Sequence, residues 1–303
     1  MTNITVSERK NWLGASETSA LFGVSPYTTK FDLWHQKVGN IAGPNLDTVE
    51  RVMAGQFLEP SIAAWASKKW DWPLVSVTEY RQHAHVPQMG CSLDFETTDV
   101  APEPIEIKNV DNLIFRDQWD HDGDIITDAP AHILVQLQHQ LACPDPKRMA
   151  MAKRGWLLVC VGGNRLYRME VPRHDEMIGR IEREVEDFWR SVKADTPPDP
   201  HFDLDADAIA MLYRGKGVDM VDLRGEDRAA QLARVYLDGL EDEKAGREQK
   251  KAALAELKTM LGDARGAFMD DGYTIKASHI KPQVQERDAH WRFAIRKSKG
   301  PIT

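Results

Sequence analysis

Cys91-Ser92-Leu93-Asp94 and Ile105-Glu106-Ile107-Lys108 are the two stretches from which the fold of this 303-residue chain can be inferred. Residues 105–110 are predicted to form a short β-strand, in which successive side chains point to opposite faces. Glu106 and Lys108 then share one face, while Ile107 points into the core from the other. Asp94, on a neighbouring short strand, can bring a second carboxylate to the same place.

Two carboxylates beside a lysine favour a site for a hard divalent cation. Mg²⁺ and Mn²⁺ prefer oxygen ligands and need few protein carboxylates, because they retain waters or bind substrate phosphates. Lys108 can orient a water or neutralise charge that develops on a phosphate. A glutamate and a lysine two residues apart also occur as a solvated pair on a surface strand. The motif alone therefore leaves both interpretations open.

The elements around these stretches predict a mixed α/β core. Residues 17–22, 30–38, 48–70, 113–119 and 131–142 have helical patterns, and 75–86 reads as one strand that ends at Pro87. A β-hairpin is predicted for 156–161 and 166–171 around Gly162-Gly163. The clearest helix of the sequence follows, with apolar residues spaced 3, 4, 3 and 4 apart at Ile178, Ile181, Val185, Phe188 and Val192.

The proline-rich break Thr196-Pro197-Pro198-Asp199-Pro200 predicts a domain boundary. We expect a core of residues 1–200 and a C-terminal extension of residues 201–303. Within the extension, 226–262 predicts one or two long packed helices rather than a free coiled coil, since Gly239 and Gly246 interrupt the run. Residues 273–296 predict two short strands around Pro282.

Composition excludes several classes of protein. The net charge is -8, and no apolar run is long enough to span a membrane. The three cysteines are too few and too scattered for a disulfide framework or a paired metal site, so we expect small buried residues. The N-terminus lacks the apolar stretch of a signal peptide. These features predict a soluble globular protein of a reducing compartment such as the cytoplasm.

Positive charge is nevertheless concentrated in two stretches. Residues 144–173 and 273–303 each contain seven basic against two acidic side chains, which gives each a charge of +5. Such stretches are either solvated faces or contacts to phosphates.

Four sequence blocks, in order, resemble the PD-(D/E)xK nuclease superfamily, and within it the lambda-type alkaline exonucleases and YqaJ-type viral recombinases. The blocks are Arg9 with Leu13-Gly14-Ala15-Ser16-Glu17; Gly55-Gln56-Phe57-Leu58-Glu59-Pro60; Asp94 with Glu106-Ile107-Lys108; and Ala129-Pro130 through Gln136. They span residues 9–142. Leu93 stands where many relatives have proline, and Phe95 where glycine is frequent, but neither change removes a ligand.

The resemblance implies a restriction-endonuclease-like fold, in which a mixed central sheet is flanked by helices, followed here by a C-terminal helical extension. It implies one Mg²⁺ or Mn²⁺ ion at Asp94, Glu106 and the backbone carbonyl of Ile107. A second ion would lie at Asp94 and Glu59. It also implies that Lys108 positions the attacking water and that Gln136 braces Lys108.

The same resemblance implies that Arg9 and Ser16 bind a DNA 5′-phosphate. Ser16 is alternatively an ordinary helix N-cap, a role that is compatible with phosphate binding.

The implied activity is that of a phage or prophage 5′→3′ double-strand exonuclease that acts on DNA ends. A single-strand annealing protein is the implied partner, and a homo-oligomer, a trimer as in processive family members, is the implied assembly. Two alternatives remain open. One is an endonuclease or repair nuclease with the same site and no need for an end. The other is a non-catalytic DNA-binding or assembly module that works through residues 201–303.

Overall fold

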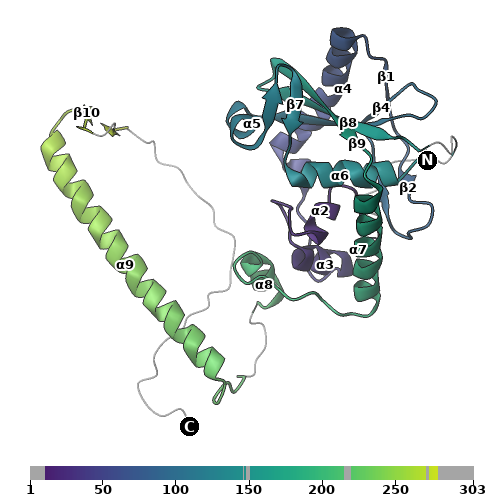
Figure 1. Cartoon of the computed structure of the whole chain (residues 1–303). Coiled ribbons are helices and arrows are strands. Elements are labelled where there is room, and N and C mark those ends of the chain that lie inside the picture. Colours follow the sequence, from purple (N-terminus) through teal and green to yellow (C-terminus); the bar gives the residue numbers. More distant parts are fainter. Residues whose placement is uncertain (1–10, 146, 148–150, 215–219, 271–272, 279–303) are drawn as a thin grey trace. The chain divides into compact units, whose positions relative to one another are not determined.

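The computed structural model describes residues 11–145, 147, 151–214, 220–270 and 273–278 (Figure 1). It divides into two compact units, Met1–Tyr213 and Arg214–Thr303. The helices of the first unit are α2 (Thr18–Leu21), α3 (Lys30–Val38), the 3₁₀ turn η1 (Leu46–Thr48), α4 (Glu50–Trp70), α5 (Asn112–Gln118), α6 (Ala131–Ala142), α7 (Asp175–Lys193) and α8 (Ala206–Leu212). Its strands are β1 (Leu74–Ser76), β2 (Arg81–Gln82), β3 (Gly90–Cys91), β4 (Phe95–Thr97), β5 (Pro104–Val110), β6 (Asp120–Asp122), β7 (Ile125–Asp128), β8 (Arg154–Val161) and β9 (Arg165–Pro172).

A seven-stranded mixed sheet forms the centre of this unit, in the order β1-β4-β5-β8-β9-β7-β6. The pairs β5–β8 and β7–β9 are parallel, and the other pairs are antiparallel. The predicted hairpin is confirmed, because β8 and β9 pair along their whole length around Gly162 and Gly163, whose φ angles are 58° and 74°. Helices flank the sheet (Figure 1), which confirms the predicted mixed α/β architecture.

The two faces of the sheet are covered by different helices. Ile62, Ala63 and Ala66 of α4 pack on one face, against a row of sheet residues that includes Ile105 and Ile107. Helices α5 and α6 cover the other face, against residues that include Leu157 and Val159 of β8. The alternation predicted for β5 therefore holds: Ile107 faces α4, and Glu106 and Lys108 face α6.

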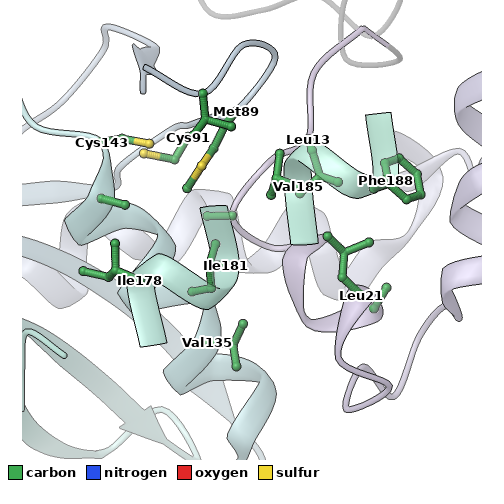
Figure 2. Close-up of a cluster of buried hydrophobic side chains, with 14 of the residues drawn as sticks. Leu13, Leu21, Met89, Cys91, Val135, Cys143, Ile178, Ile181, Val185 and Phe188 are labelled. Atoms are coloured by element: carbon green, nitrogen blue, oxygen red, sulfur yellow. The ribbon is translucent and has the colours of Figure 1, made fainter. Parts of the chain in front are cut away.

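A second apolar layer lies behind α6. The predicted stripe of α7 is buried at Ile178, Ile181, Val185 and Phe188, and it packs against residues of α2, α3 and α6 (Figure 2). Cys91 and Cys143 lie in this layer with their sulfur atoms facing each other (Figure 2). All three cysteines are free and buried, as expected.

The single strand predicted for 75–86 is wrong. The chain forms β1 on the edge of the large sheet, then leaves it and forms β2, which pairs with β3 in a separate two-stranded sheet. The buried ion pair between Arg81 and Glu96 holds β2 against β4. A charged pair under the surface has no signature in the alternation of apolar residues, and so the break was not apparent from the sequence.

The first unit ends after Tyr213 rather than at the proline break near residue 200. Ala208 of α8 is buried against Phe31 of α3 and Ile41, and Asp205 accepts hydrogen bonds from the Thr29 hydroxyl and the His201 backbone N–H. The prolines thus precede a helix that packs on the core.

The second unit contains α9 (Asp227–Leu261) and the antiparallel pair β10 (Gly266–Phe268) and β11 (Thr274–Lys276). The expected long helical run is present as a single helix. One continuous helix runs through Gly239 and Gly246, and no α9 residue is buried. The expected strand after Pro282 lies outside the described residues. Among the helices that the structure describes, none is long and apolar enough to cross a membrane.

Candidate active site

Strand β5 and the residue before β4 bring two predicted carboxylates together. Asp94 lies at the bend that leads into β4, which pairs with β5. Its Oδ2 accepts a hydrogen bond from the backbone N–H of Ile107 at 2.9 Å. Because this bond fixes Asp94 to the middle of β5, its carboxylate lies beside the face that carries Glu106 and Lys108.

Glu106 is the centre of a buried hydrogen-bond network, with only 4% of its surface exposed. Its Oε1 accepts from Lys108 Nζ at 2.5 Å and from Gln136 Nε2 at 2.7 Å. Gln136 Oε1 in turn accepts from Lys108 Nζ at 3.3 Å. The structure therefore brings Gln136 of α6 into contact with both Glu106 and Lys108.

Gln140 is a further member of the network that sequence reasoning missed. Its Nε2 donates to Glu106 Oε2 at 2.5 Å, and its Oε1 is buried with no hydrogen-bond partner among the described residues. The signal was present, because Gln140 lies four residues after Gln136 and residues four apart share a helix face. Gln138 points elsewhere and hydrogen-bonds the backbone of Pro172 and His174.

The electrostatics of the cluster favour a bound cation. Burial raises the pKa of the Asp94 carboxyl well above its ordinary value, and the charges of Glu106 and Glu59 raise it further. Burial and Glu106 also raise the pKa of Glu59, which α4 brings toward the same place. Burial alone would lower the pKa of Lys108, but the negative charges of Glu106 and Asp94 outweigh it, so the net shift is upward. The lysine stays charged beside a group of mutually repelling carboxylates.

The oxygen donors fit a divalent metal ion by their chemistry. Asp94, Glu106, the Ile107 carbonyl and Glu59 are hard ligands of the kind that Mg²⁺ and Mn²⁺ take. Across the ranges that the structure describes, no three acidic, histidine or cysteine side chains gather closely enough to form a complete cage. Mg²⁺ needs no such cage, since it is commonly held by one or two carboxylates together with waters and substrate phosphates.

An aromatic pair stands next to the lysine. The rings of Tyr27 and His132 meet edge to face with centroids 6.0 Å apart, and Tyr27 is 81% exposed. Burial and the Lys108 charge both lower the pKa of His132. Tyr27 makes a small contribution to the raised pKa of Lys108. Hydrogen bonds from the backbone N–H groups of Tyr27 and Thr28 to the Ser25 hydroxyl hold this loop. Sequence reasoning missed this pair.

The predicted phosphate-binding residues are only partly described. Arg9 lies outside the described residues. Ser16 is exposed in the turn before α2, but the N-cap of that helix is Glu17, so the N-cap interpretation of Ser16 is wrong. The Glu17 carboxylate accepts from the backbone N–H of Gly14 at 2.9 Å and from Lys37 Nζ at 2.7 Å. Ser16 is thereby left facing solvent on a well-anchored turn.

The basic stretch 144–173 carries less free charge than its composition suggests. Lys147 is paired with Glu79 at 2.7 Å, and Arg154 with Glu103 at 2.8 Å. Arg173 is paired with Asp175 and also donates to the Leu141 carbonyl. These ion pairs offset much of the positive charge of the stretch, and they favour its interpretation as a solvated face over a phosphate contact. Most of the second basic stretch lies outside the described residues.

Part of the chain matches a known protein family. Residues 6–147 match the family profile of the YqaJ-like viral recombinase domain. The YqaJ protein of Bacillus subtilis (strain 168), described as uncharacterized, is 24% identical over 187 residues. That alignment covers 60% of this chain and 53% of YqaJ, so the chain matches about half the length of this relative.

Solved structures with some similarity include an alkaline exonuclease, LHK-Exo, from Laribacter hongkongensis. It is 18% identical with a TM-score of 0.46, and the match covers 62% of this chain and 91% of that one. LHK-Exo in complex with dAMP matches at 17% identity and the same TM-score, over 67% and 96% of the two chains.

Proposed function

Because residues 6–147 match the profile of the YqaJ-like viral recombinase domain, we propose that this protein is a metal-dependent deoxyribonuclease that degrades double-stranded DNA from its 5′ ends. The observation that carries the proposal is the network at Glu106. One buried carboxylate is held by Lys108, Gln136 and Gln140, and a second carboxylate, Asp94, is tied to the same strand. A solvated surface pair would have neither the burial nor the two glutamines.

The divalent ions would be held by Asp94, Glu106 and the Ile107 carbonyl, with Glu59 and Asp94 at a second position. When bound, they would supply Lewis-acid polarisation of the scissile phosphate and lower the pKa of an attacking water. Mg²⁺ and Mn²⁺ are the expected ions.

The side chains around the ions have separate tasks. Lys108 carries its charge next to the carboxylates and would position the attacking water against the phosphate. Gln136 and Gln140 fix the Glu106 carboxylate by a hydrogen bond to each oxygen, which reduces the freedom that the site must lose on binding substrate. Tyr27, exposed beside His132, would contact the sugar or base next to the cleaved linkage.

The polarity of degradation would come from the turn before α2. Arg offers a planar fork of donors that matches a phosphate, and an exposed serine hydroxyl adds a further donor. Arg9 and Ser16 together would hold the 5′-phosphate while the ions act on the adjacent linkage.

The biological setting follows from the family. A recombinase domain of this kind would generate single strands for an annealing protein. The nuclease core would work as a homo-oligomer, a trimer in the simplest case, in the cytoplasm of a bacterial host.

A gel assay of linear and covalently closed circular duplex DNA with Mg²⁺ tests the proposal. We expect digestion of the linear form alone, faster with a 5′-phosphate than with a 5′-hydroxyl, and none in the presence of a chelator. Cutting of both forms would identify an endonuclease. Binding without cutting would identify a non-catalytic module.

The variant Glu106→Gln tests the network while preserving its shape. Losing one ligand charge should lower the cleavage rate by roughly 10²–10³-fold, by analogy with the loss of a single transition-state contact. Glu170→Gln is the matched control, because Glu170 is an exposed carboxylate whose ion pair with Arg154 lies away from Asp94 and Glu106. Equal rates for the two variants, with both proteins folded by circular dichroism, would remove Glu106 from the mechanism.

A further inference from the structure

Helix α9 has no buried residue within the described part of the second unit. It runs for 35 residues, and none of them is buried. Tyr236, Leu240 and Leu254 are between 43% and 46% exposed. Most helices in proteins are stabilised by packing of one face rather than by intrinsic propensity. The described residues of the second unit do not cover the large apolar side chains of α9, so these side chains are candidates for contact with another helix.

Apolar residues at the two ends of α9 lie on one line of heptad spacing. Residues separated by alternating steps of four and three form one line along the helix, here called the seam: Ala229, Ala233, Tyr236, Leu240, Glu243, Arg247, Lys250, Leu254, Leu257 and Leu261. The two ends of the seam are apolar and its middle is charged. This spacing is the pattern of a helix that packs along a second helix.

Gly239 and Gly246 lie directly beside the seam, seven residues apart. A Cβ atom at either position would meet nothing within 4 Å. Glycine within a helix costs about 1 kcal/mol relative to alanine, and nothing in α9 itself compensates for it. Close approach of another backbone is a physical reason for glycine at these two positions.

The order of residues along the seam is complementary to itself when reversed. In an antiparallel pair of α9 helices centred near Ala245, each seam residue faces a suitable residue of the second copy. The facing pairs are Ala229 with Leu261, Ala233 with Leu257, Tyr236 with Leu254, Leu240 with Lys250, and Glu243 with Arg247. Glu243 and Arg247 then form ion pairs at the centre. The Lys250 stem can lie along Leu240 with its ammonium in water.

A parallel pair lacks this complementarity. It would place Glu243, Arg247 and Lys250 each opposite its own copy, and like charges in contact are destabilising. We propose that α9 is a self-association helix that pairs antiparallel with α9 of a second copy of this chain. Two copies of the chain would then associate through α9, and this association does not depend on the activity proposed for Glu106.

Cysteine cross-linking in the full-length chain tests both the pairing and its direction. Ala233→Cys and Leu257→Cys chains, mixed and oxidised mildly, should yield a disulfide-linked dimer, because residues 233 and 257 face each other. Each variant alone should give little dimer. The unmodified chain is the control for its three native cysteines, which are buried. Strong cross-linking of either variant alone, or none in the mixture, would overturn the antiparallel pair.

Charge reversal separates pairing from the stability of the helix itself. Glu243 and Arg247 already form an ion pair within one helix, so Glu243→Arg and Arg247→Glu each remove that bond as well as the contact between copies. Each variant alone should associate roughly tenfold more weakly in sedimentation equilibrium, because like charges meet at the centre. Mixing the two should restore association through mixed pairs, although neither helix regains its internal bond.

Arg234→Glu is the matched control, because Arg234 is one residue removed from the seam and its reversal should leave association unchanged. Failure of the mixture to recover, with helix content intact by circular dichroism, would refute pairing through Glu243 and Arg247. The nuclease assay is independent of these measurements, so their failure would leave the proposed function standing.

Discussion

Helices α7 and α9 show how differently two charged helices can be stabilised in one chain. Helix α7 has 19 residues and buries one side of itself at Ile178, Ile181, Val185, Phe188 and Trp189. Helix α9 is nearly twice as long and buries nothing among the described residues. In α7 the apolar stripe is continuous, whereas in α9 the charged run 241–251 divides it. The continuity of the apolar stripe, rather than helix length or propensity, distinguishes the buried helix of the first unit from the exposed helix of the second.

The largest expected effect is on the stability of the first unit. Ile181 is fully buried in the layer between α6 and α7, so Ile181→Ala should lower its free energy of unfolding by about 2–5 kcal/mol. Val235→Ala on α9, where the side chain is 61% exposed, should change it by less than about 0.5 kcal/mol.

Tryptophan fluorescence during urea unfolding checks this pair, since eight of the nine tryptophans precede residue 214 and none lies in α9. A comparable loss in both variants would mean that α9 contributes to the stability of the first unit.

A smaller effect should appear as the pH falls. His139 of α6 is fully buried between the Thr18 hydroxyl, 2.6 Å from Nδ1, and the Gly90 carbonyl, 3.0 Å from Nε2. Because the carbonyl can only accept, Nε2 carries the proton of the neutral ring and Nδ1 accepts from Thr18. Burial lowers the pKa of His139 to about 3.

The sign of the effect follows from proton binding. Below its ordinary pKa near 6.5 the unfolded chain takes up a proton at His139 that the folded chain does not, so stability is complete above pH 6.5 and is lost progressively toward pH 3. This group alone should lower the free energy of unfolding by about 2 kcal/mol at pH 5 relative to pH 7. Urea unfolding at the two pH values, followed by tryptophan fluorescence, measures it.

His139→Gln is the control for the pH effect, because its amide can both donate and accept but does not titrate. The variant should lose most of this dependence on pH. Helix α9 contains no histidine, so its helical signal should not follow the same curve. An unchanged pH dependence in His139→Gln would assign the effect to other groups.

The parts of the site that could be predicted were those fixed by local spacing. Alternation along β5 placed Glu106 and Lys108 together, and the helix that carries Gln136 was correctly bounded at Ala131–Ala142. What could not be predicted depended on partners distant in sequence. The contact of Tyr27 with His132 and the burial of Arg81 with Glu96 join residues whose separations no periodicity encodes.

The exposure of α9 was missed for a related reason. Its composition and spacing suit packing, and only the structure shows that the described residues of the second unit bury none of it. Apolar spacing indicates that a helix has a face to cover, but not whether the cover comes from within the chain.

The last two variants each add one methyl group to a glycine, and the effect at the second position is the smallest expected. At Gly90, which lies in β3 and pairs with Gln82 of β2, a Cβ atom would lie 2.6 Å from the Arg81 carbonyl oxygen and 2.5 Å from the Tyr80 ring. Because a paired backbone carbonyl cannot move aside cheaply, Gly90→Ala should destabilise the first unit by about 1–3 kcal/mol. At Gly246, where nothing lies within 4 Å, alanine should instead stabilise α9 by about 1 kcal/mol through its higher helix propensity.

Thermal unfolding measures the two effects separately. It is followed by tryptophan fluorescence for the Gly90 variant, and by far-ultraviolet circular dichroism at low protein concentration for the Gly246 variant. Opposite signs are expected, because the same methyl group fills a space that is already occupied in the core and an empty one on the isolated helix. Destabilisation at Gly246 in dilute solution would mean that another part of the same chain already approaches α9 closely, and the contrast between the two regions would then fail.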